Sequence, residues 1–304
     1  MTKKTEYTPP TGSEIAKRQN DVDALRLLLA QRRLYSRAKA WQGIRWIGLL
    51  VLGIAAPFVS VLWPSSAVAI GAITGFWLFV GRTVLTWGET RTMTKAAAIQ
   101  EDFDLYVFAM PRTIDRTSLP SLEEIAVLAG PDENIRVAAE KERLIDWYPI
   151  GPEHAAIENV AIAQRANASY TDRLIKTSVW VWAGVTLVWI AFLTTLGALS
   201  ALTFGAVLLG VIFPVLPAAL DVLEYLISTW RAAHDRADLA NSIQSRIEGD
   251  GDPISGEDLL SWQVQMYDLR RTTPQLPNWL YKLTRKRNEA AMHSAAKQLR
   301  EKKK

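Results

Sequence analysis

The sequence predicts an all-α integral membrane protein with two transmembrane helical hairpins, four spans in total, and a helical cytoplasmic domain. Four long blocks of the 304 residues are almost free of charge, although the whole chain is only 49% hydrophobic. A helix of about 20 apolar residues satisfies its own backbone hydrogen bonds and crosses a hydrocarbon core of about 30 Å. No segment shows the alternating pattern of a β-strand, so the polar remainder is also expected to be helical.

The four predicted spans form two close pairs. They are residues 44–63, 67–87, 177–196 and 199–220. Residues 64–66 are the whole connection within the first pair, and residues 197–198 are the connection within the second. Because so few residues reverse the direction of the chain, each pair is expected to be an antiparallel helical hairpin.

The positive charges predict the orientation of both hairpins. Neither hairpin tip carries a charge, whereas all four opposite flanks hold Lys and Arg, and such flanks stay in the cytoplasm. These flanking residues are Arg32, Arg33, Arg37, Lys39, Arg45, Arg91, Lys95, Arg165, Arg173, Lys176, Arg231 and Arg236. The chain then divides into a cytoplasmic N-terminal amphipathic helix (1–43), hairpin 1 (44–87), a central cytoplasmic helical region (88–176), hairpin 2 (177–220) and a C-terminal cytoplasmic helical region (221–304).

Arg82 is the one charge that lies well inside a predicted span. A charge at membrane depth suggests a place on a conduction pathway or a gate. The alternative is structural, because Arg82 is near enough to the cytoplasmic end of its span to snorkel. In that case it would pair with Asp221 or Glu224, at the matching end of the fourth span.

Glycines and prolines provide further candidates for helix packing or gating. Gly71 and Gly75 form a GxxxG motif in the second span, which allows close approach of another helix. Pro214 and Pro217 in the fourth span, and Pro57 in the first, would bend or break their helices. A gate would use such bends, but prolines are also common in ordinary spans.

Helices are also predicted outside the spans, where several continue the membrane segments. They are residues 90–110, 121–129, 134–147, 153–176, 222–247, 256–272 and 278–300. Similar pentapeptides at 96–100 and 240–244 follow the two hairpins at corresponding places, and they indicate a duplicated hairpin unit.

Residue types that catalysis or metal binding would need are missing from the sequence. The chain has no cysteine, and its three histidines have no metal-ligand spacing. There is no Gly-rich phosphate loop, nucleophile elbow or kinase signature. We therefore expect no enzyme activity, no cofactor and no metal. The net charge of +4 is modest, and direct DNA or RNA binding is not expected.

A series of short motifs carries a family resemblance. Before hairpin 1 stand Gln19-Asn20, Ala30-Gln31-Arg32, Leu34-Tyr35 and Ala38-Lys39. The later motifs are the segments 99–104, 146–149 and 164–167, and then Pro274, Pro277, Asn278, Trp279, Tyr281, Arg285 and Glu289. In their order and their positions relative to the spans, they resemble the four-transmembrane effector family (S-4TM) associated with SMODS second-messenger synthetases. The resemblance covers nearly the whole chain, although residues 113–140 match nothing.

The resemblance implies an effector of cyclic-oligonucleotide-based antiphage signalling (CBASS). A nucleotidyltransferase synthetase activated by infection would make a cyclic oligonucleotide, and the effector would bind it in the cytoplasm. The spans would then reorganise and breach the bacterial inner membrane, so that the infection aborts. The implied partners are this second messenger, the lipid bilayer and further copies of the same chain, because such apolar spans cannot line an aqueous path alone.

Cyclic-nucleotide binding calls for cations that contact phosphates and for aromatic faces on which bases stack. The candidate ligand-binding residues are Arg143, Trp147, Tyr148, Arg165 and Asn167 in the central region, and Arg270, Trp279, Tyr281 and Arg285 in the C-terminal region. Helix packing is the alternative role for Trp147 and Tyr148. For the basic run 282–287, the alternatives are a solvated face or contact with anionic lipid.

Two other functions are compatible with the sequence: a constitutive ion channel or transporter, and a membrane scaffold that recruits a soluble partner. The spans hold almost no ionisable residue besides Arg82, which disfavours a transporter. A nucleotidyltransferase gene beside this one would favour the effector over both.

The predicted topology can be tested with reporter fusions. Fusions after Lys39, within residues 113–140 and after Lys304 should all report the cytoplasm, because positive flanks stay inside. Insertions at Ser65 or Ala198 should report the outside. A single outside signal from the first three fusions would contradict the arrangement in two hairpins.

Overall fold

The computed structural model describes residues 7–151, 155–199, 205, 212–249 and 251–276, and near the C-terminus 288, 290–292, 294–295 and 297–299. Every regular element within these residues is a helix, which confirms the predicted all-α class.

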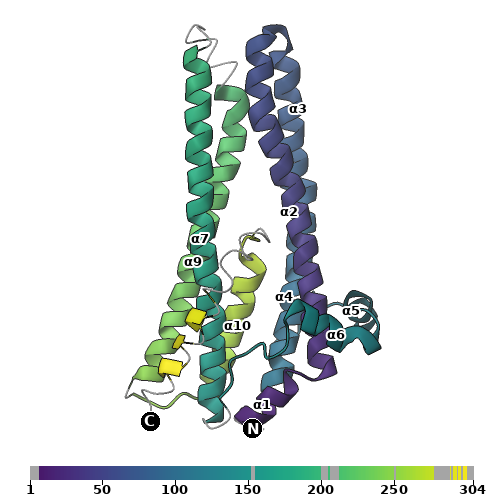
Figure 1. The fold of residues 1–304 in the computed structure, drawn as a ribbon, viewed down its shortest axis with the longest axis vertical. Coiled ribbons are helices and arrows are strands. Elements are labelled where there is room, and N and C mark those ends of the chain that lie inside the picture. The colour runs from purple at the N-terminus through teal and green to yellow at the C-terminus, as the bar shows by residue number, and fades with distance from the viewer. Residues whose placement is uncertain are drawn as a thin grey trace.

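Two long antiparallel helix pairs run side by side along the molecule (Figure 1). The first pair consists of α2 (Val22–Leu62), the 3-10 turn η1 (Pro64–Ser66), α3 (Ala67–Val80), the π-helical η2 (Gly81–Leu85) and α4 (Thr86–Phe108). The second pair consists of α7 (Ala156–Leu199) and α9 (Phe213–Glu248). The shorter elements are α1 (Gly12–Arg18), α5 (Leu122–Ala129), η3 (Asp132–Asn134), α6 (Ile135–Glu142) and α10 (Gly256–Thr272).

Three stretches of these helices are long and apolar enough to cross a membrane. They are Val22–Ser60, Ala67–Phe108 and Ala156–Leu199. Of the predicted fourth span, 199–220, the structure describes residues 199, 205 and 212–220. The connection in hairpin 1 is as short as predicted, because η1 reverses the chain within three residues.

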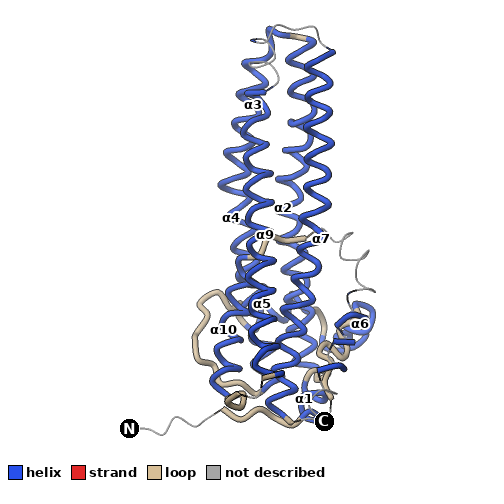
Figure 2. The backbone as a smooth tube through the Cα atoms, turned by 90° about the vertical axis from the view of Figure 1, so that its left-hand side faces the viewer, coloured by secondary structure: helices blue, strands red, loops and turns tan. Residues whose placement is uncertain are grey.

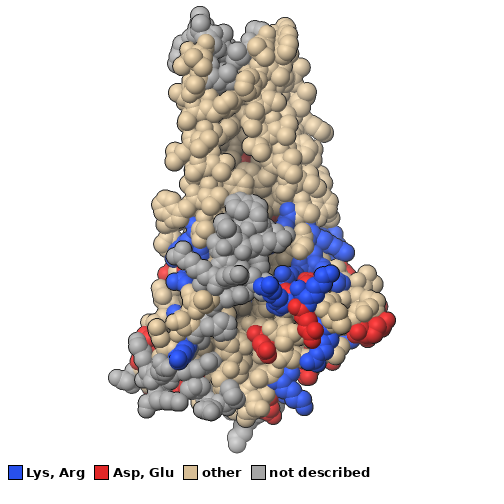
Figure 3. All heavy atoms as spheres, in the orientation of Figure 1, with Lys and Arg blue, Asp and Glu red and all other residues tan. Residues whose placement is uncertain are grey.

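The molecule has an apolar end and a charged end. The apolar end, residues 44–80 and 177–199, exposes large hydrophobic side chains such as Leu50, Phe76 and Val188. The charged end consists of residues 7–43, 86–151, 155–176, 225–249 and 251–276. Figure 3 shows the Lys, Arg, Asp and Glu side chains gathered there on the face in view. A large exposed surface of apolar side chains is unfavourable in water but suits contact with lipid.

The charged end holds the main hydrophobic core. Fully buried side chains from both helix pairs meet there, and among the largest are Leu25, Phe103, Phe108 and Ile243. The helix α10 packs against α4, α7 and α9 and so closes this end of the bundle. On the other side, α5 and α6 pack against α2 and lie beside it in Figure 1. Figure 2 shows the long helices after a quarter turn about the vertical axis.

Local sequence explains where several helices begin and end. Ser255 and Asp258 form a capping box at the start of α10, which spans Gly256–Thr272 as predicted. The helix predicted at 134–147 ends at Glu142 instead, because Arg143 adopts the left-handed conformation with φ at +57°. The break expected at Pro57 does not occur, since α2 runs through it.

A buried polar network joins the two helix pairs at the charged end. The carboxylate of Asp104 on α4 is fully buried and accepts hydrogen bonds from Tyr148 Oη (2.6 Å), Gln263 Nε2 (2.8 Å) and Arg270 Nη1 (2.6 Å). Asn167 on α7 donates to Tyr148 Oη over 3.3 Å. The Asp104 carboxylate on α4 therefore connects to α10 and to the loop at Tyr148 directly, and to α7 through Tyr148.

We expect the Asp104→Ala variant to lose about 3–5 kcal/mol of unfolding free energy, because it leaves Arg270 buried without its countercharge. Thermal melting in detergent, followed by circular dichroism, measures this loss. The double variant Asp104→Leu/Arg270→Met should recover most of it, since replacing both members of a buried pair removes the unpaired charge.

The matched control is Asp268→Ala, which removes an exposed carboxylate paired with Arg271. Its melting temperature should stay near that of the parent. An Asp104→Ala protein that melts with the control would contradict the central place of this carboxylate.

Candidate functional site

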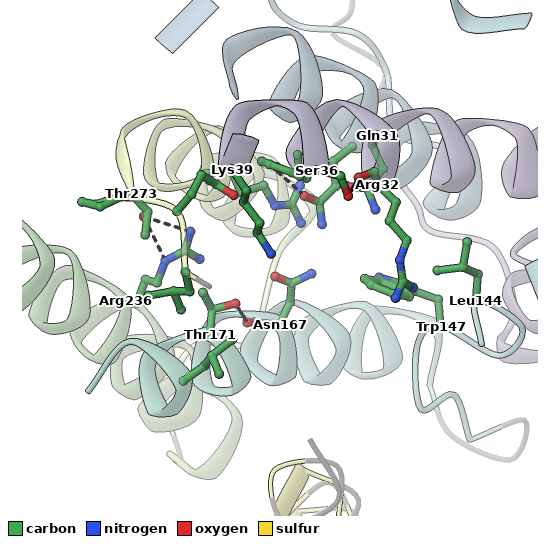
Figure 4. A pocket seen from close by; sticks show the side chains of 17 residues that line it. Gln31, Arg32, Ser36, Lys39, Leu144, Trp147, Asn167, Thr171, Arg236 and Thr273 are labelled. Carbon is green, nitrogen blue, oxygen red and sulfur yellow. Dashed lines mark hydrogen bonds between the residues drawn. The ribbon is translucent and has the colours of Figure 1, made fainter. Parts of the chain in front are cut away.

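A central cavity of about 240 Å³ lies between the two helix pairs at the charged end. Helices α2 and α4 form one wall and α7 and α9 the other, while the end of α10 and a strap (residues 273–276) close it. Figure 4 shows Arg32 and Lys39 pointing from α2 into the cavity, with Asn167 facing Lys39 from α7. The lining residues are Gln31, Arg32, Tyr35, Ser36, Lys39, Gln100, Leu144, Trp147, Asn167, Thr171, Leu174, Arg236, Arg270, Thr273, Pro274, Gln275 and Leu276.

The lining of the central cavity is cationic. It includes four basic side chains, and there is no Asp or Glu among the lining residues that the structure describes. The four are Arg32, Lys39, Arg236 and Arg270. Of these, Arg32 is held near the rim by Glu142, with 3.2 Å between Nε and Oε2. A concave surface with charge of one sign concentrates ions of the opposite sign.

Arg236 is a buried cation that has only neutral hydrogen-bond partners in the described part of the chain. Its Nη2 donates to the Leu269 carbonyl (3.1 Å) and to Thr273 Oγ1 (3.1 Å), and Nε donates to the same hydroxyl (3.3 Å). Burial, and then the nearby charge of Arg270, lower the pKa of Arg236 to about 10. The guanidinium is still charged at neutral pH, so a bound anion would relieve an existing electrostatic cost.

Arg270 has unused hydrogen-bonding capacity within the described structure. Its Nη1 binds Asp104, whereas Nε and Nη2 are buried without a hydrogen-bond partner. Burial alone would lower the pKa of Arg270, but the charge and hydrogen bond of Asp104, together with the nearby Tyr148 and Tyr35, outweigh burial and raise the pKa. A guanidinium with free N–H groups matches the oxygens of a phosphate, which it can bind through two parallel hydrogen bonds.

Aromatic and amide side chains complete the lining. Trp147 and Tyr35 are partly buried, and Tyr35 Oη donates to Gln100 Oε1 over 3.2 Å. The buried Gln31 side chain has an Oε1 atom with no partner in the described structure. Aromatic faces stack on bases, and amides both donate and accept at base edges. The cavity thus combines groups for phosphates with groups for bases.

The structure brings several of the predicted binding residues together and separates others. Trp147, Asn167 and Arg270 line the central cavity, and Tyr148 lies behind it with its hydroxyl on Asp104. Arg143 is exposed on its loop and does not line the cavity.

Arg165 also lies away from the cavity. It donates from Nε and Nη2 to Gln244 Oε1 on α9, over 3.2 and 2.8 Å. Trp279, Tyr281 and Arg285 are outside the described residues.

Sequence reasoning missed Gln31, Arg32, Lys39 and Arg236 as lining residues. One signal was present, because Gln31, Tyr35 and Lys39 are spaced by four residues and so share one face of α2. Arg236 carried no such signal, since it was one of many basic residues that set the membrane orientation.

The predicted pairing of Arg82 is confirmed. Its Nε donates to Asp221 Oδ1 over 2.6 Å, and its Nη2 contacts Glu224 Oε2 at 3.2 Å. The residue lies in the π-helical turn η2, where the Thr86 N–H bonds to the Gly81 carbonyl. This pair fastens hairpin 1 to α9 where the apolar and charged ends meet; a conduction or gating role stays a prediction.

The other gating candidates are the two glycines of the GxxxG motif in hairpin 1 and two prolines of α9. A Cβ built at Gly71 or Gly75 would meet no atom of the described chain within 4 Å. The GxxxG face is therefore not packed against another described helix. Pro214 and Pro217 lie in the first turns of α9, and α9 begins one residue before Pro214, where a missing N–H is tolerated.

A second space, the boundary cavity, lies above the central cavity between the helix pairs. Its volume is about 620 Å³, and it contains the Arg82 ion pair and a pair between Arg45 and Glu89 (3.5 Å). Pro274 in the strap lines both cavities. The strap is thus the partition between the cationic cavity and the ion pairs nearer the membrane.

These features define a class: a multi-pass, all-α membrane protein with a cationic cavity between two helix pairs. The chain matches the family model described as "SMODS-associating 4TM effector domain" over residues 13–299, and it belongs to this family. The suspected resemblance is thereby confirmed. No curated protein and no solved structure matches the chain.

Anion binding in the central cavity can be tested by thermal melting with inorganic tripolyphosphate. At saturating concentration it should raise the melting temperature of the parent protein by about 3 °C or more, because a ligand that binds only the folded state stabilises it. The Arg236→Gln variant should lose this increase, and without anion it should melt no lower than the parent, since a desolvated charge is gone.

The matched control is Arg165→Gln, which removes a half-buried cation outside the cavity. It should keep the full response. If Arg165→Gln lost the response to tripolyphosphate and Arg236→Gln kept it, the anion site would lie on the α7–α9 face and not in the central cavity.

Proposed function

We propose that the chain is a non-enzymatic effector of bacterial antiphage signalling that binds a cyclic oligonucleotide in the central cavity and then permeabilises the inner membrane. The observation that carries this proposal is the cationic lining shared by the two helix pairs. A ligand held there contacts both pairs at once, so its binding energy depends on their relative position.

The lining favours a nucleotide over a simple anion. Arg236 and Arg270 can bind phosphates. The Trp147 ring can stack on a base, and the amides of Gln31 and Asn167 can form hydrogen bonds with base edges. A volume of about 240 Å³ lies below the range of about 300–1,000 Å³ that is usual for pockets that bury whole small molecules. A cyclic oligonucleotide would therefore favour a wider arrangement, in which the helix pairs stand further apart.

The strap offers a route from the cavity to the membrane. Widening the central cavity would displace residues 273–276, and Pro274 would transmit this displacement to the boundary cavity. There the pair of Arg82 with Asp221 and Glu224 holds the two hairpins together. Separation of this pair would release the membrane segments to reorganise.

The finer topology belongs to the same proposal. The fourth span would complete hairpin 2, and both termini would lie in the cytoplasm with the charged end. Several copies would assemble to form the breach, and the uncovered face of Gly71 and Gly75 offers a surface for close helix contact between copies.

A constitutive channel and a membrane scaffold are the competing functions. Neither function makes use of the buried Arg236, which has only neutral hydrogen-bond partners in the described structure, or of the unpartnered N–H groups of Arg270. In a sensor, both guanidinium groups would bind phosphate. In membranes reconstituted with purified protein, a constitutive channel would cause leakage without a signal, whereas a scaffold would never cause leakage.

Dye release from liposomes tests the proposal. With purified full-length protein, one cyclic dinucleotide or trinucleotide should trigger release. Lys39→Gln should require about tenfold more nucleotide, because one charged contact to phosphate is lost. Lys39→Arg should keep most of the response, and Arg165→Ala should respond like the parent.

Each other result has a definite meaning. Release that ignores every nucleotide would favour a constitutive channel. Nucleotide binding without release would favour a scaffold. Loss of the response in Arg165→Ala alone would place the ligand on the face of α7 that binds Gln244.

A further inference from the structure

A third concave surface, the outer groove, lies on the far side of α2 from the central cavity. It runs between α2 and α4 where the apolar and charged ends meet, and its volume is about 510 Å³. Arg37 and Lys39 are two residues apart on α2, so they point to nearly opposite sides of the helix. The outer groove and the central cavity are therefore separate sites.

The two walls of the outer groove carry the same order of side chains. On α2, the sequence from the charged end upward is Arg37, Trp41 and Ile44. On the antiparallel α4, Lys95 and Arg91 line the groove, and Trp87 follows one turn beyond the lining. In both helices these residues are three or four apart, so each set forms one stripe.

The stripes change from basic to apolar at the level where a membrane surface is expected. Trp41 is 37% exposed, Ile44 48% and Trp87 63%, which is unusual for such side chains in water. Arg37 and Arg91 are also exposed, one turn nearer the charged end. This vertical order matches a phospholipid, whose phosphate lies outside its acyl chains.

The cations of the outer groove are poorly neutralised by the protein. Its lining contains Arg37, Arg91 and Lys95, and the one carboxylate in that lining, Glu124, is bound by Lys95 at 2.7 and 2.9 Å. The Arg91 guanidinium stacks over the Trp87 ring at 5.2 Å, which leaves its edge free for an anion. Arg37 forms no ion pair within the described structure.

The approach of α2 and α4 at the upper end of the groove is fixed by Gly88. A Cβ on this residue would come within 3.0 Å of the Trp41 ring, which packs against the glycine backbone. Trp41 is thereby held at the top of the groove, above the two arginines. The groove is a preformed concavity and not simply a row of basic residues at a helix end.

We propose that the outer groove binds the headgroup of an anionic phospholipid, with its phosphate between Arg37 and Arg91 and its acyl chains along Ile44 and Trp87. A soluble anion has the same phosphate chemistry but gains nothing from the exposed apolar side chains beside the cations. A bound lipid would fix the depth of hairpin 1 in the bilayer. This inference does not depend on nucleotide binding in the central cavity.

Native mass spectrometry of the purified full-length protein tests the proposal. Titration with phosphatidylglycerol should give a tightly bound lipid that phosphatidylcholine does not give. The double variant Arg37→Gln/Arg91→Gln should bind phosphatidylglycerol about tenfold more weakly or worse. Arg37→Lys/Arg91→Lys should retain most of the binding, because the charge is kept.

The matched control is Arg136→Gln/Lys141→Gln, which removes the same charge from α6, remote from the apolar end. It should bind phosphatidylglycerol like the parent. If the Arg37→Gln/Arg91→Gln variant and this control bound phosphatidylglycerol equally, and had equal helix content by circular dichroism, the proposed lipid site would be wrong. Displacement of the lipid by millimolar glycerol phosphate would instead assign the groove to soluble phosphates and overturn the lipid assignment.

Discussion

The contact between Asp104 and Arg270 is the constraint on which the charged end depends. Both side chains are almost completely buried, and the carboxylate also accepts from Tyr148 and Gln263. A buried ion pair contributes little net stability, but it fixes relative positions, because either charge left alone would be costly. Here it fixes α10 against α4, and through Tyr148 and Asn167 it also reaches α7.

The helices pack more extensively within each hairpin than between the two hairpins. Within each hairpin, the helices contact each other along most of their length, whereas between the hairpins the contacts are fewer. The central and boundary cavities occupy this weaker junction. The two hairpins can thus change their relative position without unpacking internally, which is the usual condition for a two-state helical assembly.

The membrane segments and most helices were predictable because their signals are local. A run of apolar residues identifies a span without knowledge of its neighbours, and the capping box at Ser255 marks the start of α10 in the sequence itself. The pairing of Arg82 was predictable for a related reason, since a charge near lipid has few available partners. The early end of α6 was not, because Arg143 takes its left-handed conformation without a glycine or proline to announce it.

The sequence did not predict the central cavity, and it singled out only some of the residues that line it, because the lining comes from distant segments between Gln31 and Leu276. Trp147, Asn167 and Arg270 stood out as aromatic, amide or basic residues in polar helices. Lys39 and Arg236 could equally be membrane-flanking charges, and only the packing of α2 against the second helix pair shows that they face a shared space. Helical spacing alone does not show which face of a long helix is covered, because this depends on how the helices pack together in the folded protein.

The long helices have a consequence for how the protein is made. Helices α2, α4, α7 and α9 each supply residues to the main core. Two of them, α2 and α7, also contain a membrane-capable stretch, and α4 forms the end of the third, Ala67–Phe108, which begins in α3. The core draws on residues from Tyr7 to Leu299, so no contiguous piece of the chain outside the membrane segments contains a complete copy of it. The core can close only after the last helices have emerged and both hairpins have reached their places. An incompletely inserted chain would consequently lack the cationic cavity, because the helices that line it would not yet pack against one another.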